Sequence, residues 1–285
     1  EECLNMKKIT RRSFLAAAGL TAAALALTAC GGSSSSTASS VASSAAASSE
    51  AASSSAAAAE VTTVEAGKLT MATNAAFPPY EMTTDSGDFE GIDIETAQAI
   101  ADKLGLELQI DDMDFDAALL SVQQGKADIV MAGVTVTDER KAVMDFSDSY
   151  ATGIQSIIVP EGSDIASPDD LAGKKIGTQR GTTGYIYCSD DFGDENVVAY
   201  DDGLTAVQAL NNGQVDAVVI DNAPAQEFVA ANPGLVILET SYAEEDYAIG
   251  MAKGSSLEDA INAALEELKA DGTLQSIVDK YISAE

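Results

Sequence analysis

The sequence predicts an α/β protein with two lobes, each a mainly parallel sheet flanked by helices, joined by a two-strand hinge. The first observation is that strand and helix patterns alternate along residues 68–221, as in parallel sheets with crossover helices. The second is a repeated frame, because "VQQGKADIVMAG" (122–133) and "LNNGQVDAVVID" (210–221) share the pattern apolar–x–x–Gly–x–x–Asp–x–Val. The third is a pair of extended segments, at 150–160 and 243–252, that are placed to cross between the lobes.

Apolar spacing and glycine stops place the individual elements. In the first lobe the expected order is strand 68–73, helix 92–105, strand 106–110, helix 115–125 and strand 127–133. In the second lobe it is strand 173–179, a helix opening at 181–187, strand 197–200, helix 203–213 and strand 215–220. An amphipathic helix pair is expected at 256–282. We therefore expect lobe 1 at 61–149 and 245–285, lobe 2 at 155–243, and the hinge at 150–154 and 244–248.

The first sixty residues read as export and anchoring signals. A basic start and the apolar run "FLAAAGLTAAALALTA" predict a signal peptide over 1–29, with 1–5 preceding the natural start at Met6. "TRRSFL" (10–15) also resembles a twin-arginine export signal, and both export routes stay open. "LTAC" resembles a lipobox, which predicts lipidation of Cys30; a plain secretory signal is the alternative. The Gly/Ser/Ala-rich stretch 30–60 is expected to be a disordered tether.

Composition excludes several classes of function. With 15 basic and 46 acidic residues, the formal net charge is −31, so nucleic acid and anionic membrane surfaces are poor partners. No histidine is present, which excludes a histidine-based catalytic triad and a histidine-ligated metal site. Of the three cysteines only Cys188 falls in the globular part, so that part has no internal disulfide. We expect no cofactor and no metal.

Six segments occur in an order that is typical of one known family. They are "ATNAAFPPYE", "GIDIETAQAIADKLG", "MAGVTVTDERKAVMDFSDSY", "GTQRGTTG", "VDAVVIDNAPA" and "EELKADGTLQSIVDKY". Together they resemble the family 3 extracellular solute-binding proteins, the amino-acid-binding components of ABC importers, over residues 68–283. The resemblance implies a two-lobed periplasmic-binding-protein-like fold of type II that closes on a free amino acid.

The resemblance implies that Arg140 clamps the carboxylate of the ligand. A guanidinium fits a carboxylate bidentately, and Arg140 follows "TVT", where a strand end delivers side chains to a cleft. From the residues alone, a surface ion pair with Asp138, Glu139 or Asp145 is the alternative. Thr135 is implied as the hydroxyl partner of the same carboxylate, although it is also an ordinary β-branched strand residue.

The second lobe is expected to grip the ligand as well. Thr182 and Thr183 open a helix whose backbone N–H groups suit an anion, and an ordinary N-cap is the alternative. Asp221 is implied as the counter-ion of the ligand ammonium, and it can also cap the helix that follows. Gly133 is implied to offer its carbonyl to the same ammonium. Asp216 reads as structural.

The groups that read the ligand side chain are less well defined. Phe77 and Phe115 match aromatic positions that flank it, with core packing as the alternative. Asn74 and Gln179 match variable positions that read it, and both are neutral amides. We therefore expect a polar side chain such as that of glutamine or cystine, while a cationic one stays possible and Arg180 could favour an acidic one.

Two other classes of protein remain as alternatives. An enzyme on the same fold, of the dehydratase or lytic type, would need an acid–base pair among the many carboxylates. A sensor domain would normally be joined to a transmembrane segment or a signalling module. We expect instead a monomer that is no enzyme, lipid-anchored at the outer face of the cell membrane or in the periplasm, and that partners the membrane subunits of an ABC permease.

Overall fold

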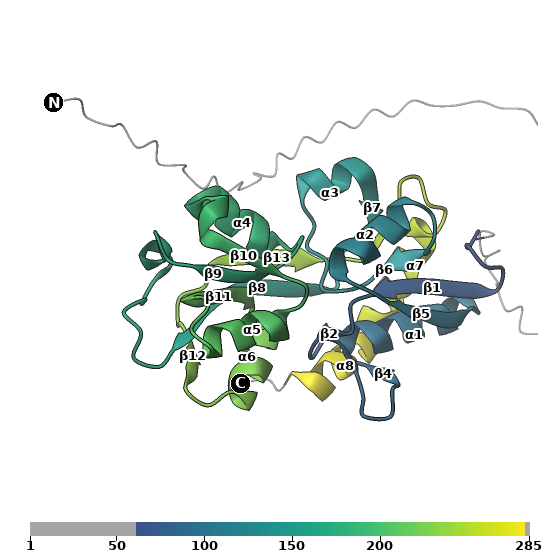
Figure 1. Ribbon diagram of the computed structural model, residues 1–285. Helices are drawn as coiled ribbons and strands as arrows, with labels where there is room; N and C mark the ends of the chain where they lie inside the picture. Colours follow the sequence, from purple (N-terminus) through teal and green to yellow (C-terminus); the bar gives the residue numbers. More distant parts are fainter. Residues whose placement is uncertain (1–60, 283–285) are drawn as a thin grey trace, which may run out of the picture. The chain divides into compact units, whose positions relative to one another are not determined.

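The computed structural model describes residues 61–282. The predicted signal peptide, Cys30 and the tether lie outside the described residues. Within 61–282, no helix is both long and apolar enough to cross a membrane. The described chain forms two lobes, each with its own central sheet (Figure 1).

The first lobe is built on a five-stranded sheet. Its order is β5 (Glu107–Asp112), β1 (Lys68–Thr73), β6 (Ile129–Val130), β14 (Gly250–Ala252) and β7 (Met144–Phe146). β1 pairs in parallel with β5 and β6, whereas β14 is antiparallel to both of its neighbours. Only β14 opposes the other strands, so the sheet is mainly parallel as predicted.

Helices lie on both faces of this sheet (Figure 1). On one face α1 packs against α7 and α8, and on the other α2 packs against β1, β6 and β14. Their bounds are α1 Ile92–Leu104, α2 Phe115–Gln123, α3 Asp138–Val143, α7 Glu258–Ala270 and α8 Thr273–Tyr281. A small antiparallel sheet of β2 (Ala76–Phe77), β3 (Glu81–Thr83) and β4 (Phe89–Glu90) precedes α1.

The second lobe repeats this plan. Its sheet order is β10 (Val197–Tyr200), β9 (Ile176–Gln179), β11 (Ala217–Asp221), β8 (Ala151–Pro160) and β12 (Leu235–Ile237). β8 runs antiparallel to β11 and β12. The helices are α4 (Thr183–Phe192), α5 (Gly203–Asn211) and α6 (Asn222–Ala231), with short 3₁₀ turns η1 (Pro168–Leu171) and η2 (Asp194–Asn196).

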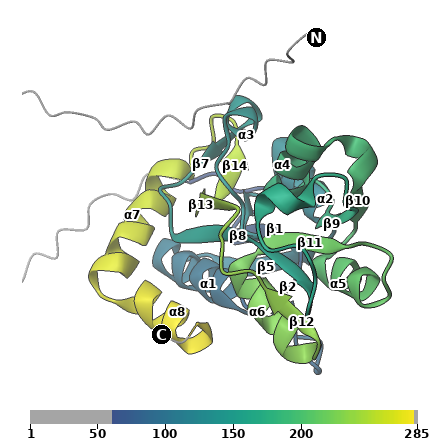
Figure 2. The same cartoon turned by 90° about the vertical axis from the view of Figure 1, so that its left-hand side faces the viewer.

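Two adjacent antiparallel strands join the lobes. β13 (Ala243–Tyr247) pairs with the first half of β8, with Glu245 opposite Gly153 and Tyr247 opposite Ala151. Gly153 is required there, because an added Cβ would lie 2.4 Å from the ring of Tyr247. After β13 the chain enters the first sheet as β14; Figure 2 labels both strands.

Apolar side chains fill both faces of each sheet. The face of the first sheet beneath α2 buries Val130, Val134 and Met144, and the face of the second sheet beneath α4 buries Ile157 and Val219. The opposite faces of both sheets contribute to one larger cluster. Burial on both faces explains why these strands read as continuous apolar runs.

Candidate functional site

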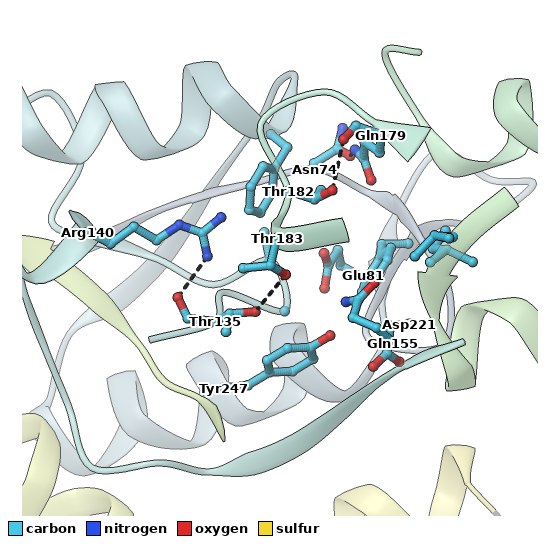
Figure 3. Close-up of a pocket in the computed structure, with 16 residues that line it drawn as sticks. Asn74, Glu81, Thr135, Arg140, Gln155, Gln179, Thr182, Thr183, Asp221 and Tyr247 are labelled. Atoms are coloured by element: carbon cyan, nitrogen blue, oxygen red, sulfur yellow. Dashed lines mark hydrogen bonds between the residues drawn. The ribbon is translucent and has the colours of Figure 1, made fainter. Parts of the chain in front are cut away.

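A pocket lies where the carboxyl ends of strands from both sheets approach each other (Figure 3). All ten residues that the sequence predicts as ligand-binding line it: Asn74, Phe77, Phe115, Gly133, Thr135, Arg140, Gln179, Thr182, Thr183 and Asp221. The other lining residues are Glu81, Ala132, Gln155, Val219, Ile220 and Tyr247. Ligand sites of open α/β sheets form at such strand ends, so the fold brings the predicted residues together.

Arg140 is a buried cation that spans the two lobes. Thr137 caps α3 by accepting a hydrogen bond from the Arg140 backbone N–H. The guanidinium donates from Nη1 to the Thr135 carbonyl at 2.7 Å and from Nη2 to the Gly181 carbonyl of the second lobe at 3.1 Å. It lies over the Phe115 ring, 5.3 Å from the centroid. Burial lowers the pKa of Arg140 and the field of Glu245 opposes that shift, but a guanidinium stays protonated in proteins.

The surface ion pair that would explain Arg140 without a ligand is not formed. Among the described residues, no carboxylate lies within salt-bridge distance of Arg140. Asp145 pairs with Lys253 at 2.6 Å instead. The positive charge of Arg140 therefore rests on neutral carbonyls and is available to an anion.

The amino terminus of α4 faces the same pocket. Thr182 caps the helix, because its hydroxyl accepts from the Tyr185 backbone N–H, and it donates to the Gln179 carbonyl at 2.8 Å. Thr183 is the first residue of the helix and is buried. A helix amino terminus carries partial positive charge and free N–H groups, so this end of the pocket suits a carboxylate.

Glu245 joins threonines of the two lobes from behind the pocket. One oxygen, Oε2, accepts hydrogen bonds from the Thr135 hydroxyl, the Thr183 hydroxyl and the Gln155 side-chain amide, each at 3.0 Å. The two hydroxyl oxygens lie 3.4 Å apart. Neither Glu245 nor Gln155 is among the site residues predicted from the sequence. Strand alternation in "EEDY" could have indicated that Glu245 and Tyr247 share one face.

Asp221 is a nearly fully buried carboxylate at the end of β11. One of its oxygens accepts from the Ile154 backbone N–H at 2.7 Å, and the other accepts from the Ala223 N–H at 3.0 Å and so caps α6. Burial raises the pKa of Asp221 to about 6, although both N–H donors oppose that shift. Capping and pocket lining are thus combined in one residue.

Gly133 occupies the matching position in the first lobe. Its φ of +55° favours glycine, and an added Cβ would lie 2.8 Å from the Phe77 ring. Its N–H donates to Asp93 at 3.0 Å, and the Tyr150 hydroxyl donates to the other Asp93 oxygen at 2.7 Å. Burial raises the pKa of Asp93 to about 6.

Glu81 is the principal site residue that the sequence analysis missed. It lines the pocket at 0% exposure, and neither carboxylate oxygen has a hydrogen-bond partner within residues 61–282. Burial, and then the nearby charge of Asp93, raise the pKa of Glu81 well above its ordinary value. The two carboxyl groups approach each other without the geometry of a hydrogen bond. A buried carboxylate of this kind is stabilised by a cation or a donor group.

The two amides predicted to read the ligand side chain bond to each other. Gln179 Nε2 donates to Asn74 Oδ1 at 2.8 Å, across the two lobes, and also to the Asp201 carbonyl at 3.3 Å. Asn74 Nδ2 donates to the Met113 carbonyl at 3.0 Å. Figure 3 shows this pair at the edge of the pocket. Contact with a ligand stays a prediction for both.

Aromatic rings form the apolar walls. Phe77 and Phe115 are both buried and line the pocket. Phe77 stacks with Tyr80 at 5.8 Å between centroids, and Tyr80 meets Tyr247 edge to face at 5.4 Å. These rings give the pocket a water-excluding wall beside its charged groups.

The family model for bacterial extracellular solute-binding proteins, family 3, matches residues 69–284. The chain belongs to this family. The resemblance inferred from the six segments is therefore correct. The relatives of this chain are named as amino-acid-binding proteins, several of them of ABC transporters, and not as enzymes, in agreement with the prediction that the protein is no enzyme.

Characterised relatives of this family 3 chain differ in the amino acid they are named for. The L-cystine-binding protein TcyJ of Escherichia coli (strain K12) is 33% identical over 226 residues, covering 78% of this chain and 85% of TcyJ. The arginine-, lysine-, histidine-binding protein ArtJ from Geobacillus stearothermophilus superposes with a TM-score of 0.73 at 34% identity, covering 76% of this chain and 96% of ArtJ. An ancestral arginine-binding protein bound to arginine gives a TM-score of 0.72 at 43% identity, covering 76% of this chain and 99% of the ancestral protein. The two-lobed type II fold is thereby confirmed.

Proposed function

We propose that this extracellular solute-binding protein captures a free amino acid with a cationic side chain and delivers it to an ABC permease. The observation that carries the proposal is the excess of buried, unpartnered acceptor atoms at the pocket. They comprise both oxygens of Glu81 and Oε1 of Gln155, on residues that line the pocket. Unpartnered buried acceptors are costly, and a ligand rich in N–H donors would satisfy them.

The ligand carboxylate would bind at the positive end of the pocket. Arg140 has no acid partner among the described residues, and the amino terminus of α4 faces the pocket with Thr183. A carboxylate placed there would be held from both lobes, since Arg140 belongs to the first and Thr183 to the second. Water exclusion by Phe115 and Phe77 strengthens this charge pairing.

The ligand ammonium would bind at Asp221 and Gly133. Asp221 supplies the negative charge and lies at the end of β11, and Gly133 lies at the end of the equivalent segment of the first lobe. The hydroxyls of Thr135 and Thr183 lie on the pocket wall and can accept further N–H donors. This would satisfy the zwitterionic backbone of the ligand.

The charge balance of the pocket favours a cationic side chain. The lining includes one cation, Arg140, and two carboxylates, Asp221 and Glu81. A zwitterion would engage Arg140 and Asp221 and would leave Glu81 buried without a partner, where its raised pKa favours the protonated form. A ligand with one further positive charge would pair with Glu81 as well and would favour its ionised form. ArtJ and the ancestral protein, named for arginine, support this class.

A neutral polar side chain is the second candidate. The amides of Asn74 and Gln179 favour it, because they could exchange their mutual hydrogen bond for bonds to a ligand amide. TcyJ, named for cystine, supports this class.

The remaining parts of the proposal concern the whole transport cycle. The lobes would open and close about the β8–β13 pair, with lobe 1 at 61–149 and 245–285 and lobe 2 at 155–243. Hinges of this kind absorb domain closure in a few residues, and a ligand that binds the closed form better drives closure. A monomer anchored through a lipidated Cys30 would then present the closed lobes to the permease.

The deciding experiment compares arginine with citrulline by calorimetry and by thermal shift, after the protein has been unfolded and refolded to remove carried ligand. Citrulline replaces the guanidinium by a neutral group of the same shape. We expect arginine, lysine or ornithine to bind at least about a hundredfold more tightly than citrulline, as a buried charge pair implies. At 1,000 times its Kd, the ligand should stabilise the protein by about 4 kcal/mol.

Glu81→Gln is the matched variant. It keeps the shape of the side chain and should narrow the preference for arginine over citrulline. Tight binding of glutamine, cystine or citrulline without binding of arginine would select the neutral class. The absence of binding by any amino acid would refute the proposal.

A further inference from the structure

Glu245 is a buried carboxylate that the proposed contacts do not use. It lies on β13, at 6% exposure, and it does not line the pocket. Its oxygen Oε2 receives three donors from residues that do line the pocket: Thr135, Thr183 and Gln155. Glu245 therefore does not face the pocket itself, but it fixes the hydrogen bonds of three side chains that do.

The hydrogen-bond chemistry of these three neighbours determines what the wall offers to a ligand. A threonine hydroxyl has one proton and two lone pairs. Because the protons of Thr135 and Thr183 are given to Glu245, both hydroxyl oxygens are left as acceptors. Gln155 likewise gives its Nε2 to Glu245, and its Oε1 has no partner.

We infer that Glu245 is a positioning residue for the ligand: it draws the donors of Thr135, Thr183 and Gln155 to itself and so presents their oxygens to the pocket as acceptors. The inference rests on the proposed function, since acceptors are useful only toward a ligand with ammonium or guanidinium donors. It also changes the predicted role of the Thr135 hydroxyl, which would accept from the ammonium and would not donate to the carboxylate.

The three side chains that donate to Glu245 come from both lobes and from the strand pair between them. Thr135 belongs to the first lobe, Thr183 opens α4 in the second, and Glu245 lies in the strand pair that joins them, opposite Gly153. The acceptor set is complete only when both threonines reach the same oxygen. Through Glu245, the preference of the pocket for ligands with N–H donors therefore depends on how closely the two lobes approach each other.

Glu245→Gln tests the inference with L-arginine as the probe. The amide is of the same size but carries no charge. Its oxygen would hold the three donors more weakly than Oε2 does, and its NH₂, if turned toward the threonines, would free their protons to point into the pocket. We expect the Kd for arginine to rise about tenfold or more, the loss of a charge-assisted hydrogen bond. Glu244→Gln is the matched control, because it removes the same charge from an exposed neighbour in the same strand. Its Kd should stay at the wild-type value.

A double-mutant cycle between Glu245 and the two threonines distinguishes an effect through the threonine hydroxyls from a direct effect of the Glu245 charge on the ligand. In a Thr135→Val/Thr183→Val background, Glu245→Gln should weaken binding much less than in the wild-type background. An equal effect in both backgrounds would mean that the charge acts directly, and would overturn the inference. Unchanged or tighter binding of arginine by Glu245→Gln would overturn it as well.

Two further results keep the test decisive. If Glu245→Gln does not fold, Glu245→Asp retains the charge and withdraws the carboxylate from the threonines, and it should also weaken binding; an unchanged Kd would refute the inference. Wild-type protein that binds no amino acid would overturn the proposed function together with the inference. Wild-type protein that binds arginine while Glu245→Gln binds it equally well would overturn the inference alone.

Discussion

The repeated frames at 122–133 and 210–221 are alike at their shared aspartates and differ at their last residues. Asp128 donates its N–H to the Thr70 carbonyl and accepts the Thr70 N–H on its side chain at 2.8 Å. Asp216 makes the same reciprocal pair with Lys175, also at 2.8 Å. At their far ends, however, one frame places Gly133 in the pocket and the other places the carboxylate of Asp221.

This difference distinguishes residues that stabilise each lobe from residues that contact the ligand. The aspartates bind the start of each frame strand to the adjacent segment, and both lobes need that. The final residues meet the same ligand from opposite sides, and a zwitterion offers different groups to each side. The two lobes can therefore share a frame while they differ at its last residue.

The largest effect is expected when the end of the second frame is changed. Asp221→Asn can keep the cap of α6 with its amide oxygen, but it removes the charge and the acceptor of the Ile154 N–H. The Kd for the amino acid should therefore rise about a hundredfold or more, as for a buried charge pair that loses one partner. Calorimetry measures this change. Asp216→Asn, in the middle of the same frame, should leave the Kd unchanged. An equal loss of affinity in the two variants would contradict the division into structural and ligand-binding residues.

Acidification should weaken ligand binding through the carboxyl groups at both lobes. The pKa of Asp221 and that of Asp93 behind Gly133 are each raised to about 6. Since cation binding needs ionised carboxylates, affinity should fall by up to about tenfold per pH unit and per group as pH drops below 6. Binding isotherms between pH 4.5 and 8 measure this, and a flat profile would show that neither group is coupled to the ligand.

The stability of the empty protein should respond to pH with the opposite sign. A carboxylate whose folded pKa is raised binds more protons in the folded state than in the unfolded state between about pH 4 and 6. The free energy of unfolding should therefore fall as pH rises through this window, by up to about 1.4 kcal/mol per pH unit and per group. In Asp221→Asn the contribution of Asp221 should be missing from urea unfolding curves.

At the shared aspartates in the middle of the frames, a substitution should change the stability of the protein and not its affinity for the ligand. Asp128 is buried and accepts two backbone N–H groups, from Val64 at 2.7 Å and from Thr70. Asp216 is exposed and its side chain accepts one, from Lys175. Asp128→Ala should lower the free energy of unfolding by about 2–3 kcal/mol, and Asp216→Ala by about 1 kcal/mol or less. A larger loss in Asp216→Ala would refute this ranking.

The smallest effect is expected at the strands beside the frames. β1 and β9 end at equivalent places, and Asn74 and Gln179 bond to each other there. Gln179→Leu should change the Kd for arginine by about fivefold at most, and Arg180→Ala, an exposed neighbour, should have no effect. A change in the ratio of arginine to citrulline affinity would instead show that the amides read the ligand side chain.

Local patterns were sufficient to predict most elements. β1 has the predicted bounds 68–73, and α1 ends before Gly105, which adopts the left-handed conformation with φ 69°. The predicted strand 127–133 is paired only over Ile129–Val130, because an apolar run indicates burial and not hydrogen bonding. The predicted return strand 243–252 is two strands, since the chain changes sheets after Tyr247, and apolar spacing carries no sign of that.

The site was predictable only in part. The resemblance to the family gave the ten lining residues, whereas Glu81, Gln155 and Glu245 were missed. In the sequence Glu81 and Glu245 look like ordinary acids of a very acidic protein. Their burial depends on residues outside their own strands, such as Thr135 beside Glu245, 110 residues away along the chain, and no local pattern contains that information.

Tyr247 has a consequence for how this pocket can be redesigned. Its ring lines the pocket and also rests on Gly153 in the strand pair that joins the lobes. A smaller side chain at 247 would enlarge the pocket and would also uncover Gly153 in the strand pair. A side chain larger than glycine at 153 would displace the Tyr247 ring, which is part of the pocket wall. The size of the pocket and the packing of the strand pair that joins the lobes therefore depend on the same ring.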